Sequence, residues 1–353
     1  MPKIRSSGII TLIIGLSVYV LYIYYIGFDE VLKTLSNIGF LEISLFIILT
    51  IFVIFLHSFT WYLLIKEYST ESKITFKNIF GIVVIALFSG YVVPVGAVTE
   101  VMRITLSIIK YKIRSSVAIA SVIIHRLYIS SSALILFFII FTLRAYLKGI
   151  YSLSYGELII VSAYMILVVS PNLSILGFMS TGIFKKILDR VKQFIEKKVV
   201  RRRTTFDPEI FVRDHIIYVR KSLFSINTIL TYIVSIAEWF FLSLAVYVLM
   251  YGFVGKLEDP LYSVMSAIVF QMIYWIMPLS FIGSLGIADF ILTLSLQVIG
   301  LTPHLATSLV ILYRTMTFLV ILILYYPITR ISKIENLDKL VKEGINMIYG
   351  KNT

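Results

Sequence analysis

Residues 90–104 read GYVVPVGAVTEVMRI. A proline, two glycines, a glutamate and an arginine interrupt a part of the chain that is otherwise strongly apolar. Backbone that leaves the helix inside a membrane has no water to pair with, so it is tolerated only where protein or a wet cavity surrounds it. The stretch therefore predicts a functional break in a membrane-embedded helix.

The composition of the chain indicates a membrane protein. Hydrophobic residues make up 59% of the 353 residues and charged residues only 14%, whereas soluble domains carry about 25% charged residues. The net charge of +13 could indicate nucleic-acid binding, but the basic residues lie in short loops between apolar runs, where membrane rules apply. We expect an all-α polytopic membrane protein, a single integral membrane domain over 1–353, with membrane lipids as partners and no nucleic acid.

Six apolar runs are long enough to cross a bilayer, which takes roughly 20 residues. They lie at about 8–26, 40–65, 116–143, 157–180, 223–250 and 305–328. The first has no A-x-A-like cleavage site, so we expect a retained helix rather than a signal peptide. Two pairs of shorter runs each flank a glycine-containing break, at 78–93 with 101–113 and at 261–280 with 286–300.

Lysine and arginine gather on one side of the predicted membrane. Twelve lie in the loop 181–221, and both ends of 78–113 are also basic. The opposite side receives only Lys33, Arg144, Lys148 and Lys256. The positive-inside rule then predicts a multi-pass protein of the cell membrane with both termini in the cytoplasm.

The charge pattern also decides how the short runs are placed. Because both ends of 78–113 are cytoplasmic, this stretch cannot be one crossing, and we expect a re-entrant helical hairpin. A second hairpin, at 261–300, opens to the other side. The hairpins and their flanking spans then form an inverted repeat, at about 40–143 and 223–328, a plan that places transport sites near the midplane. The alternative is two full crossings per pair, giving a ten-span bundle.

Each predicted repeat contains a glycine-containing tip, an acid, and an arginine about ten residues into the next span. Glu100 precedes Arg126 by 26 positions, and Asp289 precedes Arg314 by 25. Half-helices that start at the tips, with Thr99 as the N-cap of the first, would direct N–H groups inward and form an anion site. The candidate binding residues are Arg103, Arg126, Arg314, Glu100, Asp289, Glu238, Gly96, Gly283, Ser284 and Gly286.

The same residues allow a purely structural interpretation. Arg126 with Glu100, and Arg314 with Asp289, would be ion pairs that hold hairpins to spans. His57 and His125 are expected to be hydrogen-bonded interior residues. Three arginines face three buried acids, so an anionic ligand would compete with the acids or bind while one of them is protonated, and proton coupling is left open. No metal-ligand or catalytic motif is visible, so we expect no metal, no cofactor and no enzymatic activity.

Two basic segments lie outside the predicted spans. The loop 181–221 contains an amphipathic run at 183–203, and the tail 330–353 is a milder version. Apolar residues at helical spacing with Lys and Arg on the other face predict interfacial helices on anionic lipid headgroups. Calmodulin-like or nucleic-acid binding is the alternative that we disfavour.

Together these residues resemble the transmembrane region of lysylphosphatidylglycerol synthase, found in bacterial and archaeal membrane proteins. The resemblance covers roughly 1–330 and rests on Pro94, Gly96, Glu100 and Arg103 in the first tip, on Gly283, Gly286 and Asp289 in the second, and on IIHRLYI around Arg126 and LYRTMTF around Arg314. The chain departs from the usual pattern with Ile129 in place of an acid, with Asp289 in place of Glu, and without an extra basic residue near the first proline.

The resemblance implies a lipid flippase. In synthase relatives this region moves the lipid that a separate soluble domain makes, and we expect no such domain here. Some archaeal relatives carry the region beside a glycosyltransferase that acts on polyprenyl phosphate, so the cargo would be a phospholipid or a polyprenyl-phosphate-linked sugar, and a partner enzyme would make it. The alternatives are a secondary transporter of a small anion and, less favoured, an intramembrane enzyme.

Overall fold

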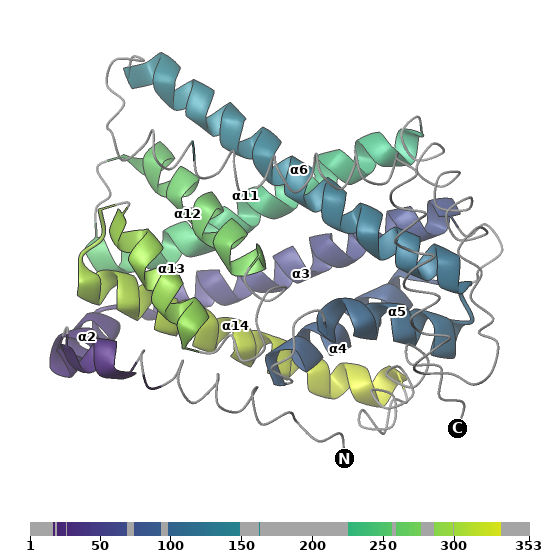
Figure 1. The fold of residues 1–353 in the computed structure, drawn as a ribbon, viewed down its shortest axis with the longest axis horizontal. Helices are drawn as coiled ribbons and strands as arrows, with labels where there is room; N and C mark the ends of the chain where they lie inside the picture. The colour runs from purple at the N-terminus through teal and green to yellow at the C-terminus, as the bar shows by residue number, and fades with distance from the viewer. Residues whose placement is uncertain are drawn as a thin grey trace, which may run out of the picture.

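The computed structural model describes residues 17, 20–25, 27–68, 74–92, 98–148, 162, 225–255, 259–276, 286–298 and 300–332. Within these residues the chain is helical and contains no strand (Figure 1). Four helices are long and apolar enough to cross a membrane: α3 (Phe40–Tyr68), α6 (Ser115–Lys148), α11 (Ile226–Val254) and α14 (Pro303–Ser332). The protein is therefore a multi-pass membrane protein, as predicted.

These four helices coincide with four of the six predicted spans. Most of the predicted span 8–26, the span 157–180, the loop 181–221 and the tail beyond residue 332 lie outside the described residues. The predicted short runs are also helices, with bounds that differ by a few residues: α4 (Phe76–Val92), α5 (Val98–Tyr111), α12 (Pro260–Ile276) and α13 (Ile287–Val298).

One helix is not predicted from the sequence. Helix α2 (Phe28–Ser36) has 9 residues and buries only Val31. It packs on α14, where the hydroxyl of Ser308 donates to the carbonyl of Val31 at 3.3 Å. A helix this short presents too few turns for a periodic apolar pattern to be recognised.

Local chemistry sets several helix ends. The Ser225 hydroxyl accepts the N–H of Thr228 at 3.3 Å and begins α11, which ends at Gly255 with φ of 73°. Asp259 accepts the N–H of Tyr262 at 3.1 Å and begins α12, whose first residue is Pro260. A side-chain acceptor before the helix, proline in the first turn and glycine just past the end are the favoured capping choices.

The helices α3 to α6 and α11 to α14 pack in matching ways. The contacts α3–α4, α4–α5 and α5–α6 have counterparts in α11–α12, α12–α13 and α13–α14. The short helix α4 also packs on α14, and its counterpart α12 packs on α6. Figure 1 shows the α4–α5 and α12–α13 pairs toward opposite ends of the molecule. The two groups of four helices therefore have equivalent surroundings.

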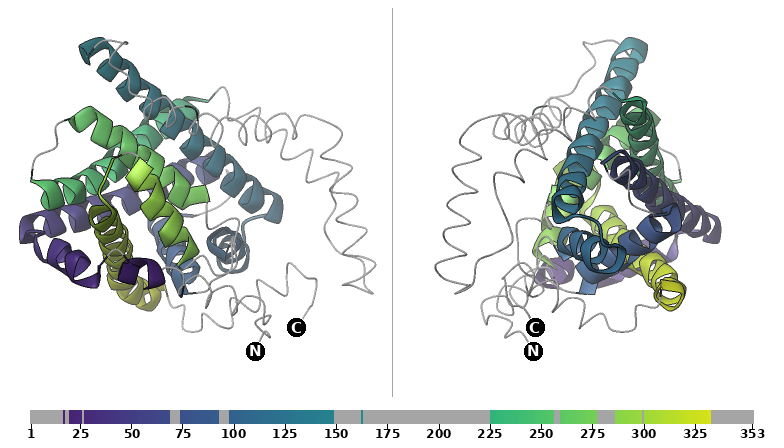
Figure 2. Two further views of the ribbon diagram at one scale, coloured as in Figure 1. Left: turned by 60° about the vertical axis from the view of Figure 1, so that its left-hand side comes forward. Right: turned by 90° about the vertical axis from the view of Figure 1, so that its right-hand side faces the viewer.

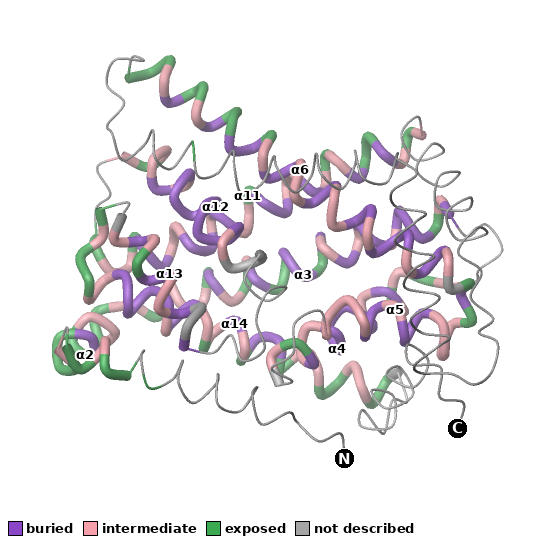
Figure 3. Tube along the Cα trace, viewed as in Figure 1, coloured by how far each residue is buried: buried purple, intermediate pink, exposed green. Residues whose placement is uncertain are grey.

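Each pair of short helices has its own apolar core. Ile82 and Val83 of α4 are buried in a cluster with side chains of α3, α5, α6 and α14. Ile268 and Phe270 of α12 are buried in a second cluster with side chains of α6, α11, α13 and α14. Large apolar side chains are exposed on the long helices, and Figure 3 shows that exposed and buried positions alternate along them. The C-terminal end of α6 extends past the other described helices in every view (Figures 1 and 2).

Candidate functional site

The first ion pair joins α5 to α6. Arg126 of α6 pairs with Glu100, which lies in the first turn of α5. The side chains keep 24% and 15% of their exposed area, so neither is fully enclosed by the described residues. Helix α5 begins at Val98, which places Thr99 inside the helix, so the prediction of Thr99 as N-cap is wrong.

The second ion pair joins α13 to α14 in the same way. Arg314 of α14 donates to Oδ1 of Asp289, which lies in the first turn of α13. The other carboxylate oxygen of Asp289 accepts the N–H of Gly286 at 3.0 Å. Gly286 has φ of 86°, a conformation that glycine adopts without strain. The side chain thus caps its own helix and holds the arginine, and both predicted ion pairs are present.

Arg103 of α5 has different surroundings. Its side chain is only 1% exposed, and its guanidinium donates to Nδ1 of His125 at 2.8 Å. The guanidinium carbon lies 4.0 Å from the centre of the Trp61 ring, a cation–π contact. Within the described part of the chain no carboxylate forms a salt bridge with Arg103.

Glu238 of α11 pairs with a histidine. It is 3% exposed, and its Oε1 lies 2.8 Å from Nδ1 of His57 on α3. The rings of His57 and His125 meet edge to face with centroids 4.7 Å apart. His125 also hydrogen-bonds the Thr60 hydroxyl at 2.7 Å. Both histidines are therefore hydrogen-bonded interior residues, as predicted, but the sequence reasoning missed their link to Glu238, which lies 181 positions from His57.

Most of the chain matches a known protein family. The profile of the family described as "Lysylphosphatidylglycerol synthase TM region" matches residues 12–324. The chain belongs to this family. No curated protein matches the chain. Both ion pairs and the cluster around His125 lie within the matched residues, so membership in the lysylphosphatidylglycerol synthase TM region family assigns them to a membrane protein with a lipid-related function.

Three candidate residues of this family member, Gly96, Gly283 and Ser284, lie outside the described residues. Among the described ones, no three His, Asp or Glu side chains are grouped closely enough to share a metal ion. The absence of a metal or cofactor in the whole chain stays a prediction.

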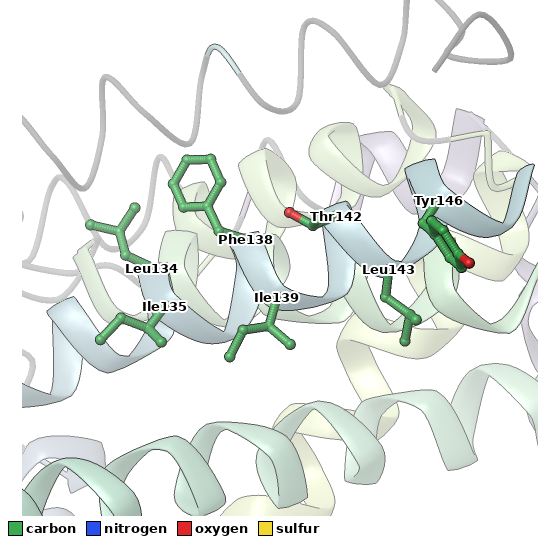
Figure 4. A pocket seen from close by; sticks show the side chains of 7 residues that line it. All are labelled: Leu134, Ile135, Phe138, Ile139, Thr142, Leu143 and Tyr146. Atoms are coloured by element: carbon green, nitrogen blue, oxygen red, sulfur yellow. The ribbon is translucent and has the colours of Figure 1, made fainter. Parts of the chain in front are cut away.

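An apolar groove of about 870 Å³ runs along the second half of α6. Figure 4 shows its lining side chains on successive turns of this one helix: Leu134, Ile135, Phe138, Ile139, Thr142, Leu143 and Tyr146. At about 100° per residue, Thr142 points roughly 160° away from Arg126. The groove therefore lies on the opposite side of α6 from the ion pair and is not part of the candidate site in this family member.

Proposed function

We propose that this protein moves a phosphate-bearing lipid, a phospholipid or a polyprenyl-phosphate-linked sugar, between the leaflets of the cell membrane. The observation that carries the proposal is the repeated ion pair. In both halves an acid in the first turn of a short helix holds an arginine of a long helix. A phosphate can replace such a carboxylate, because its oxygens accept the same fork of guanidinium N–H groups, and the helix N-terminus favours the added negative charge.

The depth of the two arginines supports this role. Arg126 and Arg314 each lie 11 residues after the first residue of their helices, Ser115 and Pro303. At about 1.5 Å per residue this is roughly 16 Å, half of a hydrocarbon core of about 30 Å. A charge at this depth costs roughly 2.5–3.5 kcal/mol on insertion scales, so both arginines need a partner, and a passing headgroup would be one.

The lengths of the short helices support re-entrant hairpins. Helices α5 and α13 have 14 and 12 residues, which reach about 21 and 18 Å and fall short of the core thickness. With α4 and α12 they would enter the membrane and return. The matched packing of α3–α6 and α11–α14, combined with basic loops on one side, favours an inverted repeat with cytoplasmic termini.

We infer that the protein transports the lipid without converting it chemically. Aspartyl chemistry in a membrane needs two acids that share a proton, but Asp289 contacts Arg314 and the start of its own helix instead. A separate enzyme would then make or consume the lipid, and anionic headgroups would bind the basic cytoplasmic segments.

The test is leaflet transfer in vesicles. The protein is reconstituted with trace NBD-labelled phosphatidylglycerol, or with labelled polyprenyl phosphate, and reduction by external dithionite reports which leaflet holds the label. We expect transfer above the rate of empty vesicles and a loss of at least about tenfold in the Arg126→Ala/Arg314→Ala variant, since one charged hydrogen bond is worth about 1.5–3 kcal/mol.

A matched control uses another arginine of α14. Arg330 lies in the last turn and stacks on Tyr326, so Arg330→Ala should keep the wild-type rate. Equal transfer by wild type and the double variant would refute the role of the two arginines. Uptake of labelled inorganic phosphate without lipid transfer would instead favour the small-anion transporter.

A further inference from the structure

A buried cluster of ionisable side chains lies beside the first ion pair and has no role in the lipid contacts proposed above. It consists of His57 on α3, Arg103 on α5, His125 on α6 and Glu238 on α11, and we refer to it as the histidine cluster. His125 directly precedes Arg126, which holds Glu100. His125, Arg103 and Glu238 are all less than 4% exposed. Buried ionisable groups inside a membrane are expensive and commonly mark ion pathways.

The hydrogen bonds fix the protonation state of His125. Arginine only donates, so Nδ1 of His125, 2.8 Å from the Arg103 guanidinium, must accept. The proton of His125 then sits on Nε2 and is donated to the Thr60 hydroxyl at 2.7 Å, while Thr60 donates its own proton to the carbonyl of His57 at 2.9 Å. His125 is therefore neutral, because a second ring proton would point at Arg103.

The other histidine has a place for a proton nearby. Nδ1 of His57 donates to Oε1 of Glu238 at 2.8 Å. The second carboxylate oxygen of Glu238 is buried and has no hydrogen-bond partner in the described part of the chain. A buried carboxylate oxygen without a donor is costly. One added proton on Glu238 neutralises the carboxylate and so removes the cost of burying an incompletely paired charge.

The charges around this pair determine what an added proton does. With neutral histidines, Glu238 balances Arg103, and Glu100 balances Arg126. From α14, Arg314 is held by Asp289. The helices α4 and α12, which pack on α3 and α11, carry as ionisable residues only Lys77, Tyr91, Tyr262 and Tyr274. One bound proton therefore leaves the histidine cluster with one net positive charge beside Arg126.

We propose that His57 and Glu238 form a proton-binding site, and that one proton crosses the membrane together with one anionic lipid headgroup. This inference rests on the proposed lipid translocation. The proton enters from the aqueous phase on one side and leaves to the other. The positive charge that it adds favours a phosphate at the neighbouring Arg126, and by thermodynamic reciprocity the phosphate favours the proton. The pair crosses as a neutral unit.

This coupling predicts a specific distribution of lipid. In vesicles with trace NBD-labelled phosphatidylglycerol and a pH difference of one unit, the label should accumulate about tenfold in the leaflet that faces the alkaline side, since one proton per lipid converts one pH unit into a factor of ten. An imposed membrane potential should not change this ratio, because the load is neutral. Protein-free vesicles give the background.

Two substitutions on α11 separate coupling from folding. Glu238→Gln should abolish the accumulation, because an amide cannot bind the proton. Ser235 lies one helical turn before Glu238, and its buried hydroxyl has no hydrogen-bond partner among the described residues. Ser235→Ala should therefore keep the accumulation. An even label distribution in wild type that transfers lipid, or tenfold accumulation by Glu238→Gln, would overturn the coupling and leave translocation standing.

A separate measurement covers the case in which no lipid moves. NMR of ¹³C-labelled histidine rings in micelles of the wild-type protein should show the His57 ring responding to proton uptake as the pH is lowered. His57→Gln assigns the signal, and Glu238→Gln should lose this response. Absence of any titration in a folded wild-type protein would refute the proton site. Titration without lipid transfer would keep the site and refute the proposed function.

Discussion

Arg103, Arg126 and Arg314 meet the cost of a charge inside the membrane in two ways. Arg126 and Arg314 each hold a carboxylate and stay partly exposed. Arg103 is enclosed, with an aromatic face and an imidazole nitrogen as its contacts. Removing one partner of a buried pair is costly because it leaves the other charge uncompensated, so the acids should matter for stability as well as transport.

Asp289 should matter more than Glu100. Asp289→Ala removes the ion pair to Arg314 and the cap on the Gly286 N–H, whereas Glu100→Ala removes only the ion pair with Arg126 among the described contacts. We expect a loss of roughly 1.5–3 kcal/mol for the charged contact in each and a further cost of about 1 kcal/mol at Asp289. Thermal unfolding in detergent, with equal midpoints for the two variants, would contradict this.

A charged contact at the membrane surface should make stability depend on pH. Asp259 accepts from Arg144 Nε at 2.8 Å and Lys148 Nζ at 2.7 Å. Burial alone would raise the pKa of Asp259, but hydrogen bonds from Lys148, the Tyr262 N–H and Arg144 outweigh burial and lower the pKa below its usual 3.8. The contribution to stability is therefore fully present above about pH 4 and is lost as pH falls through the lowered pKa.

The measurement compares wild type with Asp259→Asn. The variant should unfold at a lower temperature at pH 7, and the difference should shrink as the pH falls from 5 to 2.5. A difference that stays constant over this range would show that Asp259 acts through its shape rather than its charge.

At the scale of helices, two close approaches depend on glycine. Gly252 of α11 faces α3, where an added Cβ would lie 3.0 Å from the Cγ of Glu42. A Cβ on Gly90 of α4 would overlap the hydroxyl of Thr99 on α5. Small residues let helix backbones approach closely inside a membrane, where packing replaces the hydrophobic effect. The α4–α5 and α3–α11 interfaces therefore leave little room for a side chain at these two glycines.

This gives a test of the α4–α5 pair. Gly90→Ala should lower the unfolding midpoint, with a cost of about 1–3 kcal/mol for overpacking. The double variant Gly90→Ala/Thr99→Ala should recover most of the loss, because the overlapping oxygen is gone and the next atom, Cβ of Thr99, lies at 3.7 Å. Additive effects in this double-mutant cycle would show that the two residues do not meet.

Across the whole molecule, the two halves share packing but differ in chemistry. The residue before the central arginine is His125 in the first half and Tyr313 in the second. His125 belongs to the histidine cluster, whereas the Tyr313 hydroxyl donates to Gln271 at 3.0 Å. The Tyr313–Gln271 contact contains no acid or imidazole, so the described residues offer no equivalent of the histidine cluster around Arg314.

The proposed topology can be tested because the chain has no cysteine. Single cysteines at Lys112 and Gly300 should react with a large impermeant reagent from opposite faces of the membrane. Cysteines at Val98 and Ile287, where α5 and α13 begin, should react only with a small permeant reagent. Impermeant labelling of Val98 from the face opposite to Lys112 would show a full crossing and remove the first hairpin.

The sequence by itself determined the membrane class, the four long helices and the four short helices α4, α5, α12 and α13. It also pointed to both ion pairs. Hydropathy and the similar offsets of Glu100–Arg126 and Asp289–Arg314 are visible locally, because the bilayer constrains each segment independently. Only the tertiary structure brought His57 to Glu238 and placed Arg103 on Trp61. Helices that are apolar all round carry no stripe to show which faces meet, so side-chain packing between distant helices decides those contacts.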